Sequence, residues 1–411
     1  MVTAVTKQLL GARDTLWLGA MALVVFALLL PFAAYVGALP LIREEWNLSN
    51  TGAGAIYSAN LAGYAVAALL VLPLTDRVGP KRVLLVSAAV AVAAHVMFPL
   101  LARDVYSASA LRALDGFGLV GVYMPAVRIA AERFSGARRG LAVGLMVTAF
   151  YAGNSASIAS TGALLTIMSW RAAYLTVALI AGLALPVAWV ALRGYTHQRS
   201  QASGRLNLRV LRIPRVKPLI AGYSLHSMEL FAAHVWIPSF FAAMLLTQGH
   251  DIERAAITAA AGAGIAFGVG SLGPVMGGAI SDRLGRIPSA ALIFGLGGAF
   301  AAGIGWMGGA PWALLILAAA AYSWLMAADS AIYTTAITEA VPKPMLGSAL
   351  ALQAFIGMAA GAASPVLFGG ILDLAPDRSE WGIGFSVVAG LAVIGVALLL
   401  RARRNVSGPH G

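Results

Sequence analysis

Two carboxylates stand inside long apolar runs, where a charged group is costly and marks a candidate functional site. Glu229 lies within YSLHSMELFAAHVW and Asp329 within YSWLMAADSAIYTT. His226 precedes Glu229 by three residues, which places the two side chains about 60° apart around a helix and about 4.5 Å apart along it. The two groups could therefore share a proton or a cation. The alternative is structural, with a protonated carboxyl or the imidazole bonded to a neighbouring helix.

Further polar residues stand in other apolar runs. Arg112 and Asp115 in RALDGFG could pair through an i,i+3 contact or bind a solute. Asn154 belongs to MVTAFYAGNSASIASTGALL, which is rich in hydroxyl side chains. His95 is expected to be a buried histidine with satisfied hydrogen bonds. The candidate substrate-binding or proton-binding residues are Glu229, Asp329, His226, Arg112, Asp115 and Asn154.

Enzymatic chemistry is not indicated. The chain has no cysteine, which excludes thiolate ligands, disulfides and cysteine nucleophiles. His226 and His234 would lie about 12 Å apart along a straight helix, too far to hold one metal ion with Glu229. GFGLVG at 116–121 matches a dinucleotide-binding pattern but lies in an apolar helix with no preceding strand. No H-E-x-x-H, P-loop or G-x-S-x-G sequence occurs, so we expect no enzyme, cofactor or metal site.

The elements that carry these residues are membrane-spanning by composition. The chain has 411 residues, of which 60% are hydrophobic and 11% charged, and its mean hydropathy is +0.84. Soluble domains carry about 25% charged residues. Apolar runs of about 20 residues can cross a bilayer. The runs predict twelve spans, at 15–39, 51–74, 83–101, 108–131, 140–166, 171–192, 218–246, 255–280, 287–308, 311–337, 345–373 and 382–400.

One polar break is longer and more basic than the others. Residues 193–217 predict a cytoplasmic linker between two six-helix bundles, 1–192 and 218–411. Lys and Arg are concentrated in the loops on the linker's side of the membrane, which predicts a cell (inner) membrane protein with both termini cytoplasmic. The net charge of +12 would then face anionic lipid of the bilayer. Nucleic acid is not an expected partner.

The two predicted bundles carry related motifs. LTDRVGPKR at 74–82 has a counterpart, ISDRLGRIP, at 280–288. Such recurrence indicates an internal duplication, an architecture that is typical of secondary transporters. Three pairs of residues recur at almost the same separation, namely Asp76 with Asp282, Glu132 with Glu339, and Gly140 with Gly347.

These motifs resemble those of the major facilitator superfamily over essentially the whole chain. The family's G-x-L-x-D-R-x-G-R-[RK] motif is nearly complete in the second copy, whereas the first has Leu72 in place of the leading Gly and Pro80 at the first basic position. RALDGFG resembles the fourth-helix motif, with Asp115 in place of Gln, and SWRAAY at 169–174 resembles the start of the sixth helix. The resemblance implies an all-α membrane protein with twelve transmembrane helices in two pseudo-symmetric six-helix bundles.

The resemblance also implies an inner gate. In this family the loop Asp lies at a helix N-terminus of the other half, and the Arg pairs with the acid that ends the fourth helix. The helix dipole and charge-assisted hydrogen bonds would favour both contacts, and we expect Arg128 to join them. The alternative is that these charges only fix the topology. The expected gating residues are Asp76, Arg77, Gly79 and Glu132, with the repeat equivalents Asp282, Arg283, Gly285 and Glu339.

The function implied is secondary active transport of a small organic solute by alternating access, through proton-coupled symport by a monomer. In the family, helices 1, 4, 7 and 10 line the central cavity, so Glu229 and Asp329 are expected to face each other or the cavity. The fifth span lacks the G-P-x-x-G-G element of drug antiporters, which favours import. The alternative is proton-coupled efflux of a cation, metal or drug, followed by a non-transporting membrane sensor.

Overall fold

The structure is a computed structural model that describes residues 11–196, 207–377 and 379–404. Within these ranges the chain forms helices and no strand. Twelve helical segments of this part are long and apolar enough to cross a membrane, which confirms the predicted fold class. Residues 197–206 of the predicted linker lie outside the described residues.

The N-terminal bundle contains the first six spans. Two of them are each built from two helices in line, α2 with α3 and α9 with α10, and a short helix, α5, follows the second span. The helices are α2 (Ala12–Leu29), α3 (Ala34–Trp46), α4 (Asn50–Leu70), α5 (Leu74–Arg77), α6 (Pro80–Leu101), α7 (Val105–Arg133), α8 (Gly136–Leu165), α9 (Trp170–Gly182) and α10 (Ala184–Ala191).

The C-terminal bundle contains the last six spans, and one of them is again built from two helices in line. Short 3-10 helices precede its first and fifth spans. The elements are η1 (Leu208–Arg212), α11 (Val216–Thr247), α12 (Ile252–Gly270), α13 (Gly273–Leu284), α14 (Arg286–Ile304), α15 (Trp312–Ala340), η2 (Lys343–Met345), α16 (Leu346–Leu374) and α17 (Glu380–Arg404).

The predicted spans agree with these helices to within a few residues, except at the end of the first. That span was expected to end at residue 39, before the charges of Arg43 and Glu44, but α3 continues to Trp46. The helix ends at Asn47, whose φ of 48° is left-handed, a conformation that Asn adopts more readily than most residues. The helix therefore continues through charged residues beyond the apolar part of the span.

The break between α2 and α3 supports a buried site. Pro31 has no N–H and its ring clashes with the preceding turn, which weakens a regular helix at this point. The groups freed by the break find partners in the bundle. The hydroxyl of Ser157 on α8 donates to the Leu30 carbonyl and accepts from the N–H of Ala33, at 2.9 Å. Arg112 of α7 donates to the carbonyl of Phe32 at 3.1 Å.

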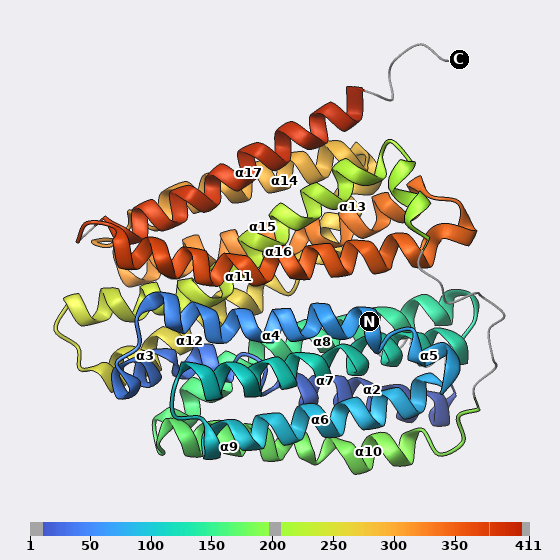
Figure 1. Cartoon of the computed structure of the whole chain (residues 1–411), viewed down its shortest axis with the longest axis horizontal. Coiled ribbons are helices and arrows are strands. Elements are labelled where there is room, and N and C mark those ends of the chain that lie inside the picture. The colour runs from blue at the N-terminus through green and yellow to red at the C-terminus, as the bar shows by residue number, and fades with distance from the viewer. Residues whose placement is uncertain (1–10, 197–206, 378, 405–411) are drawn as a thin grey trace.

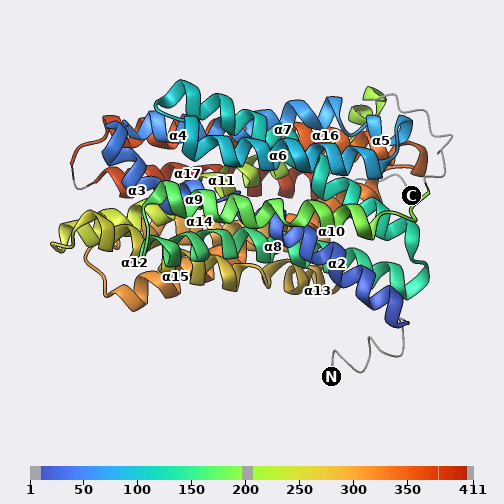
Figure 2. The same ribbon diagram turned by 90° about the horizontal axis from the view of Figure 1, so that it is seen from below.

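The two bundles lie side by side, with their helices roughly parallel to the long axis (Figure 1). Figure 2, seen from below, shows the helices of the N-terminal bundle running the same way. We call one end the linker end, because α2 and α11 begin there and α10 and α17 end there. The opposite end, where α4 begins and α16 ends, is the far end.

Close packing of helices joins the bundles towards the far end. A Cβ atom added to Gly54 of α4 would lie 2.2 Å from the carbonyl oxygen of Pro365, and one added to Gly369 of α16 would lie 2.3 Å from that of Asn50. Only glycine allows these backbones to approach so closely, as in other small-residue contacts between membrane helices. On the other side of the interface, α8 packs against α12.

Large apolar side chains are exposed on the outer surface of both bundles. Leu183 is 69% exposed, Leu317 66%, Val393 70% and Val86 65%. A protein in water rarely leaves so many large apolar side chains uncovered. Together with the spans, this surface is that of a multi-pass membrane protein in contact with lipid.

Candidate functional site

The C-terminal bundle holds a buried group of three titratable residues, which we call the C cluster: His226 and Glu229 of α11 and Asp329 of α15. Each of the three is 1% exposed. Nδ1 of His226 lies 3.0 Å from Oδ1 of Asp329. Oε1 of Glu229 points towards α14, since a Cβ atom added to Gly297 would lie 3.3 Å from it. The helices thus bring His226 into contact with Asp329, and Glu229 is an electrostatic neighbour of Asp329.

The C cluster has more polar atoms than ordinary hydrogen bonds to satisfy them. Within the described chain, Oε1 of Glu229 and both carboxylate oxygens of Asp329 lack a hydrogen bond of good geometry. Buried polar atoms without partners are rare, and each calls for an explanation such as a functional role. The hydroxyl of Tyr322 lies beside Glu229, but no Lys or Arg in the described ranges forms a salt bridge with either acid.

The N-terminal bundle holds a different buried group, which we call the N cluster: Arg112 and Asp115 of α7, His95 of α6 and Asn60 of α4. Arg112 and Asp115 form the predicted i,i+3 pair, at 2.8 Å. Nε2 of His95 lies 2.9 Å from the other oxygen of Asp115, and Nδ2 of Asn60 donates to Asp115 at 2.6 Å. The guanidinium of Arg112 is fully buried.

Aromatic rings enclose Arg112 on three sides. The guanidinium carbon lies 5.9 Å from the ring centre of Phe32 and 5.8 Å from those of Tyr35 and Tyr57. Such cation–π contacts stabilise a desolvated cation. With its hydrogen bond to the break between α2 and α3, Arg112 ties α7 to the first span.

The six predicted binding residues therefore separate into two groups and one single residue. Asn154 of α8 joins neither cluster through any hydrogen bond described here, and its Oδ1 is buried without a partner in this part of the chain. Sequence reasoning missed two members of the N cluster. His95 was expected only to be a satisfied buried residue, and Asn60 was not considered, although an Asn inside an apolar span was a visible signal.

At the linker end, acids and arginines form one group in each bundle. Arg128 of α7 donates to Asp76 at 2.6 Å and to Glu132 at 2.8 Å. Arg286 of α14 donates to Asp282 at 2.5 Å and to Glu339 at 2.9 Å. Two glycines with the predicted equivalence precede α6 and α14, and both are left-handed, with φ of 89° and 88°, which favours glycine. They are Gly79 and Gly285.

The partners of these acids differ from the predicted ones. Arg77 and Arg283 were expected to pair with the helix-ending acids, but neither forms a salt bridge within the described residues; Arg128 and Arg286 hold the acids. Arg128 lies one turn before Glu132 on α7 and also reaches Asp76 of α5, whereas Arg286 at the start of α14 reaches back to Asp282 of α13 and across to Glu339 of α15. The expected role of Arg128 in this group agrees with the geometry.

Tyr195 completes the linker-end group of the N-terminal bundle. Its hydroxyl donates to Oε2 of Glu132. Burial, together with the neighbouring carboxylate, raises the pKa of Tyr195 above its usual value, so the phenol remains a hydrogen-bond donor. The residue just beyond α10 is thus tied to the end of α7.

The expected contact of Asp76 with a helix N-terminus of the other half is also absent from the described contacts, where its partner is Arg128. A contact of that kind occurs at the far end instead. Asp373, near the end of α16, accepts from the N–H groups of Asn50 and Thr51, at 2.9 and 2.8 Å, at the start of α4. A carboxylate is stabilised there by the helix dipole, so Asp373 joins the two bundles.

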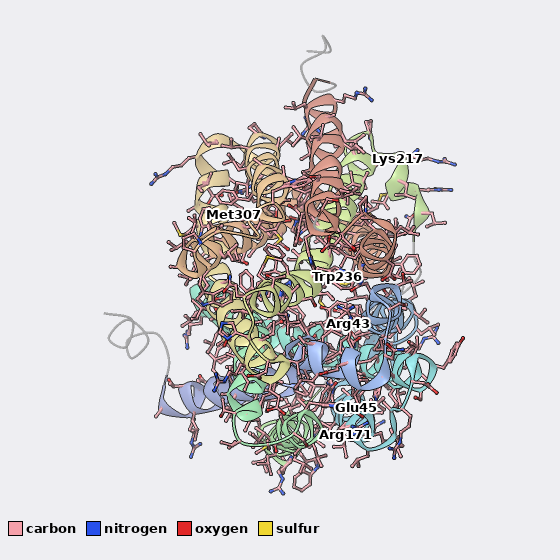
Figure 3. The ribbon with its side chains drawn as sticks, turned by 90° about the vertical axis from the view of Figure 1, so that its left-hand side faces the viewer. Arg43, Glu45, Arg171, Lys217, Trp236 and Met307 are labelled. Carbon is pink, nitrogen blue, oxygen red and sulfur yellow. The ribbon has the colours of Figure 1, made fainter. Side chains whose placement is uncertain are left out.

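The rest of the far end contains polar contacts within each bundle. Glu45 accepts from Arg171 at 2.5 Å, and Trp236 donates to the carbonyl of Pro365 at 3.1 Å. Figure 3 shows Arg43 and Trp236 close to the boundary between the bundles, with Glu45 and Arg171 further into the N-terminal bundle. Of the far-end contacts named here, that of Asp373 with the start of α4 joins the two bundles.

Two bundles of six spans with unsatisfied carboxyls buried at mid-span define a membrane transport protein. No group of three His, Cys, Asp or Glu able to hold a metal ion occurs in the described part of the chain. The model of the Major Facilitator Superfamily matches residues 21–365, and the chain belongs to that family. It is a transporter and not an enzyme.

Three curated relatives are similar at low identity. The gallate transporter of Pseudomonas putida is 31% identical over 154 residues, which cover 36% of this chain and 33% of that protein. The probable sulfoacetate transporter of Cupriavidus necator is 25% identical, covering 68% of this chain and 67% of that protein. The gentisate transporter of Corynebacterium glutamicum is 24% identical, covering 90% and 84%.

The fold is similar to that of solved transporters. A bacterial homologue of the human lysosomal transporter Spinster, in an inward-facing and occupied conformation, superposes with a TM-score of 0.75. It is 14% identical in sequence, and the match covers 96% of this chain and 98% of that one. The likeness concerns the fold alone.

Proposed function

We propose that the protein imports a small organic acid together with protons, by alternating access to a site between its two bundles. The observation that carries this proposal is the charge balance of the C cluster. Two carboxylates and a neutral imidazole carry two negative charges, and no buried Lys or Arg within the described residues offsets them. Since low-dielectric surroundings penalise net charge, the cluster approaches neutrality only by binding protons or a cation.

Other titratable groups around the C cluster are tyrosines. Tyr322 and Tyr333 come from α15, Tyr223 from α11 and Tyr151 from α8. The facing part of α14 contributes Phe294 and Gly297 instead. A tyrosine at neutral pH is uncharged, so the acids and His226 are the groups that can exchange protons in the ordinary range.

The class of solute is supported by the relatives. Gallate, gentisate and sulfoacetate, after which those transporters are named, are all small organic acids. The two bundles, with residues 193–217 as the connection, would move as separate units, since Arg128 and Arg286 hold the linker end of each bundle together internally. The basic linker end would be cytoplasmic in the cell (inner) membrane, and the transporter would act as a monomer.

Transport into proteoliposomes tests the proposal. Protein reconstituted at known orientation should accumulate radiolabelled gentisate, gallate or sulfoacetate when the outside is more acidic, and much less without a pH gradient. Glu229→Gln, which resembles the protonated acid, should still exchange solute between equal pools but fail to accumulate it. Glu253→Gln, the same substitution at an exposed acid of α12, is the matched control and should behave as the parent does.

Three results would count against the proposal. Accumulation that ignores the pH gradient would remove proton coupling. Transport of cations, metals or drugs, with none of the organic acids moved, would favour efflux of those solutes. If Glu229→Gln accumulates solute as well as the parent does, Glu229 is a packing residue and the coupling site lies at Asp329 or in the N cluster.

A further inference from the structure

Aromatic side chains from both bundles gather beside the C cluster. In the N-terminal bundle, the ring centres of Tyr123 and Phe150 are 4.5 Å apart and those of Phe150 and Tyr151 are 5.7 Å apart. In the C-terminal bundle, Tyr223 lies 5.9 Å from the ring of His226 and 6.0 Å from that of Tyr333. Each row of rings therefore has a tyrosine at the boundary between the bundles.

The two rows meet across that boundary. The hydroxyl of Tyr151 on α8 interacts with Ser330 on α15, the residue after Asp329. Tyr151 and Tyr223 are electrostatic neighbours, and Tyr64 of α4 is an electrostatic neighbour of Tyr123 and Tyr223. Four phenol groups from four helices and both bundles are thus collected around one place, which is where alternating access requires the solute to bind.

Three of the four tyrosines, and not the acids, are accessible at this place. Tyr123, Tyr151 and Tyr223 are partly exposed, whereas Tyr64, His226 and Asp329 are buried. The position of the Tyr223 ring depends on a glycine of α16, because a Cβ atom added to Gly357 would lie 2.3 Å from Cε1 of that ring. Arg112 is enclosed in the N cluster, whereas the tyrosine hydroxyls can donate to a bound carboxylate.

We propose that these four residues, Tyr64, Tyr123, Tyr151 and Tyr223, form a tyrosine cage that binds a planar aromatic carboxylic acid. The inference rests on the proposed function and names the class of its solute. The rings of the cage offer offset-stacked and edge-to-face contacts to a flat ring, and the phenol hydroxyls with Ser330 offer hydrogen bonds to its carboxylate and ring hydroxyls. A carboxylate held beside His226 and Asp329 would favour the protonated C cluster, so solute and protons would bind together.

Two ring acids that differ only in planarity provide the test. Binding of 4-hydroxybenzoate and of trans-4-hydroxycyclohexanecarboxylate to the purified parent is measured by isothermal titration calorimetry. Aromatic contacts predict an affinity about threefold to tenfold higher for the planar acid per ring pair. Tyr223→Leu and Tyr151→Leu should each reduce this preference by about the threefold to tenfold of one ring pair, while the control Tyr106→Leu, at a residue that is 86% exposed, should keep it.

The outcomes separate this inference from the proposed function. If both ring acids bind equally well, or if neither binds while the protein transports other organic acids, the cage is overturned and organic-acid transport stands. If the protein transports no organic acid at all, the proposed function fails and the cage fails with it. Gly357→Ala gives a second measurement: it should weaken binding of 4-hydroxybenzoate more than Tyr106→Leu does at an unchanged thermal midpoint, and parental binding by this variant would contradict the cage.

Discussion

The N cluster and the C cluster both contain a contact between a histidine and an aspartate, but they differ in the charged residue beside that contact. In one, His95 lies 2.9 Å from Asp115, and in the other, His226 lies 3.0 Å from Asp329. The first pair is closed by a cation, Arg112, and its charges balance with the histidine neutral. The second pair is joined by another acid, Glu229, and its charges do not balance until protons bind.

The difference shows that a buried ion pair and a proton site can be made from nearly the same residues. What separates them is the permanent charge beside them, since Arg cannot be deprotonated in proteins. A cluster whose charges balance stabilises one arrangement of its helices. An unbalanced cluster has a protonation state that can change with the conformation. We therefore assign the N cluster to structure and the C cluster to coupling.

The largest expected difference comes from the same substitution in each cluster. Asp115→Asn leaves Arg112 buried without its counter-charge, and breaking such a pair typically costs about 3–5 kcal/mol of stability. Asp329→Asn removes one of two acids and should leave stability unchanged or raise it, but abolish pH-driven accumulation. Thermal unfolding of the purified variants, followed beside uptake in proteoliposomes, measures both effects.

A double variant shows whether the cost in the N cluster is one of charge. Arg112→Met combined with Asp115→Leu removes both charges and should recover most of the stability that Asp115→Asn loses, because apolar residues can replace a buried ion pair without loss. Equal destabilisation by Asp115→Asn and Asp329→Asn would contradict the assignment of different roles to the two clusters.

The two histidines give a smaller and more selective effect. His226→Gln should shift the pH at which accumulation is fastest without abolishing it, because Glu229 and Asp329 still bind protons. His95→Gln should leave that pH profile unchanged and lower the thermal midpoint, because it removes a neighbour of Asp115 worth about 1–2 kcal/mol. A shifted pH profile in the His95 variant would place a proton site in the N cluster as well.

The fold could be predicted from the sequence because its signals are local. Apolar runs of bilayer length, basic loops on one side and a repeated D-R-x-G motif each require only a short stretch of residues. The breaks in the spans were not predicted, although Pro31 was visible, because proline also occurs within continuous helices here, as Pro125 does in α7. Whether a helix breaks depends on partners such as Ser157 and Arg112, which come from distant spans.

The sites were predictable to the extent that they lie on one helix. The Arg112–Asp115 pair and the nearness of His226 to Glu229 follow from helical spacing. The contact of His226 with Asp329, and those of His95 and Asn60 with Asp115, join different spans, and their choice of partner depends on how the helices are rotated. The same limit explains the wrong choice of Arg77 and Arg283, since Arg128 and Arg286 reach the acids from better-placed turns.

The smallest expected effect concerns the linker end, where the two bundles should behave alike. Arg128 and Arg286 each hold two acids, so here the duplication has kept the same arrangement on both sides. These side chains are partly exposed, and such pairs are worth roughly 0.5–1 kcal/mol.

Arg128→Gln and Arg286→Gln should therefore lower the thermal midpoint by similar small amounts and slow transport to a similar extent. Arg77→Gln and Arg283→Gln are the controls and should change neither the thermal midpoint nor the transport rate. Unequal losses would mean that the asymmetry of the mid-span clusters extends to the ends of the bundles, and losses in the Arg77 or Arg283 variants would restore the pairing that the motif alone suggests.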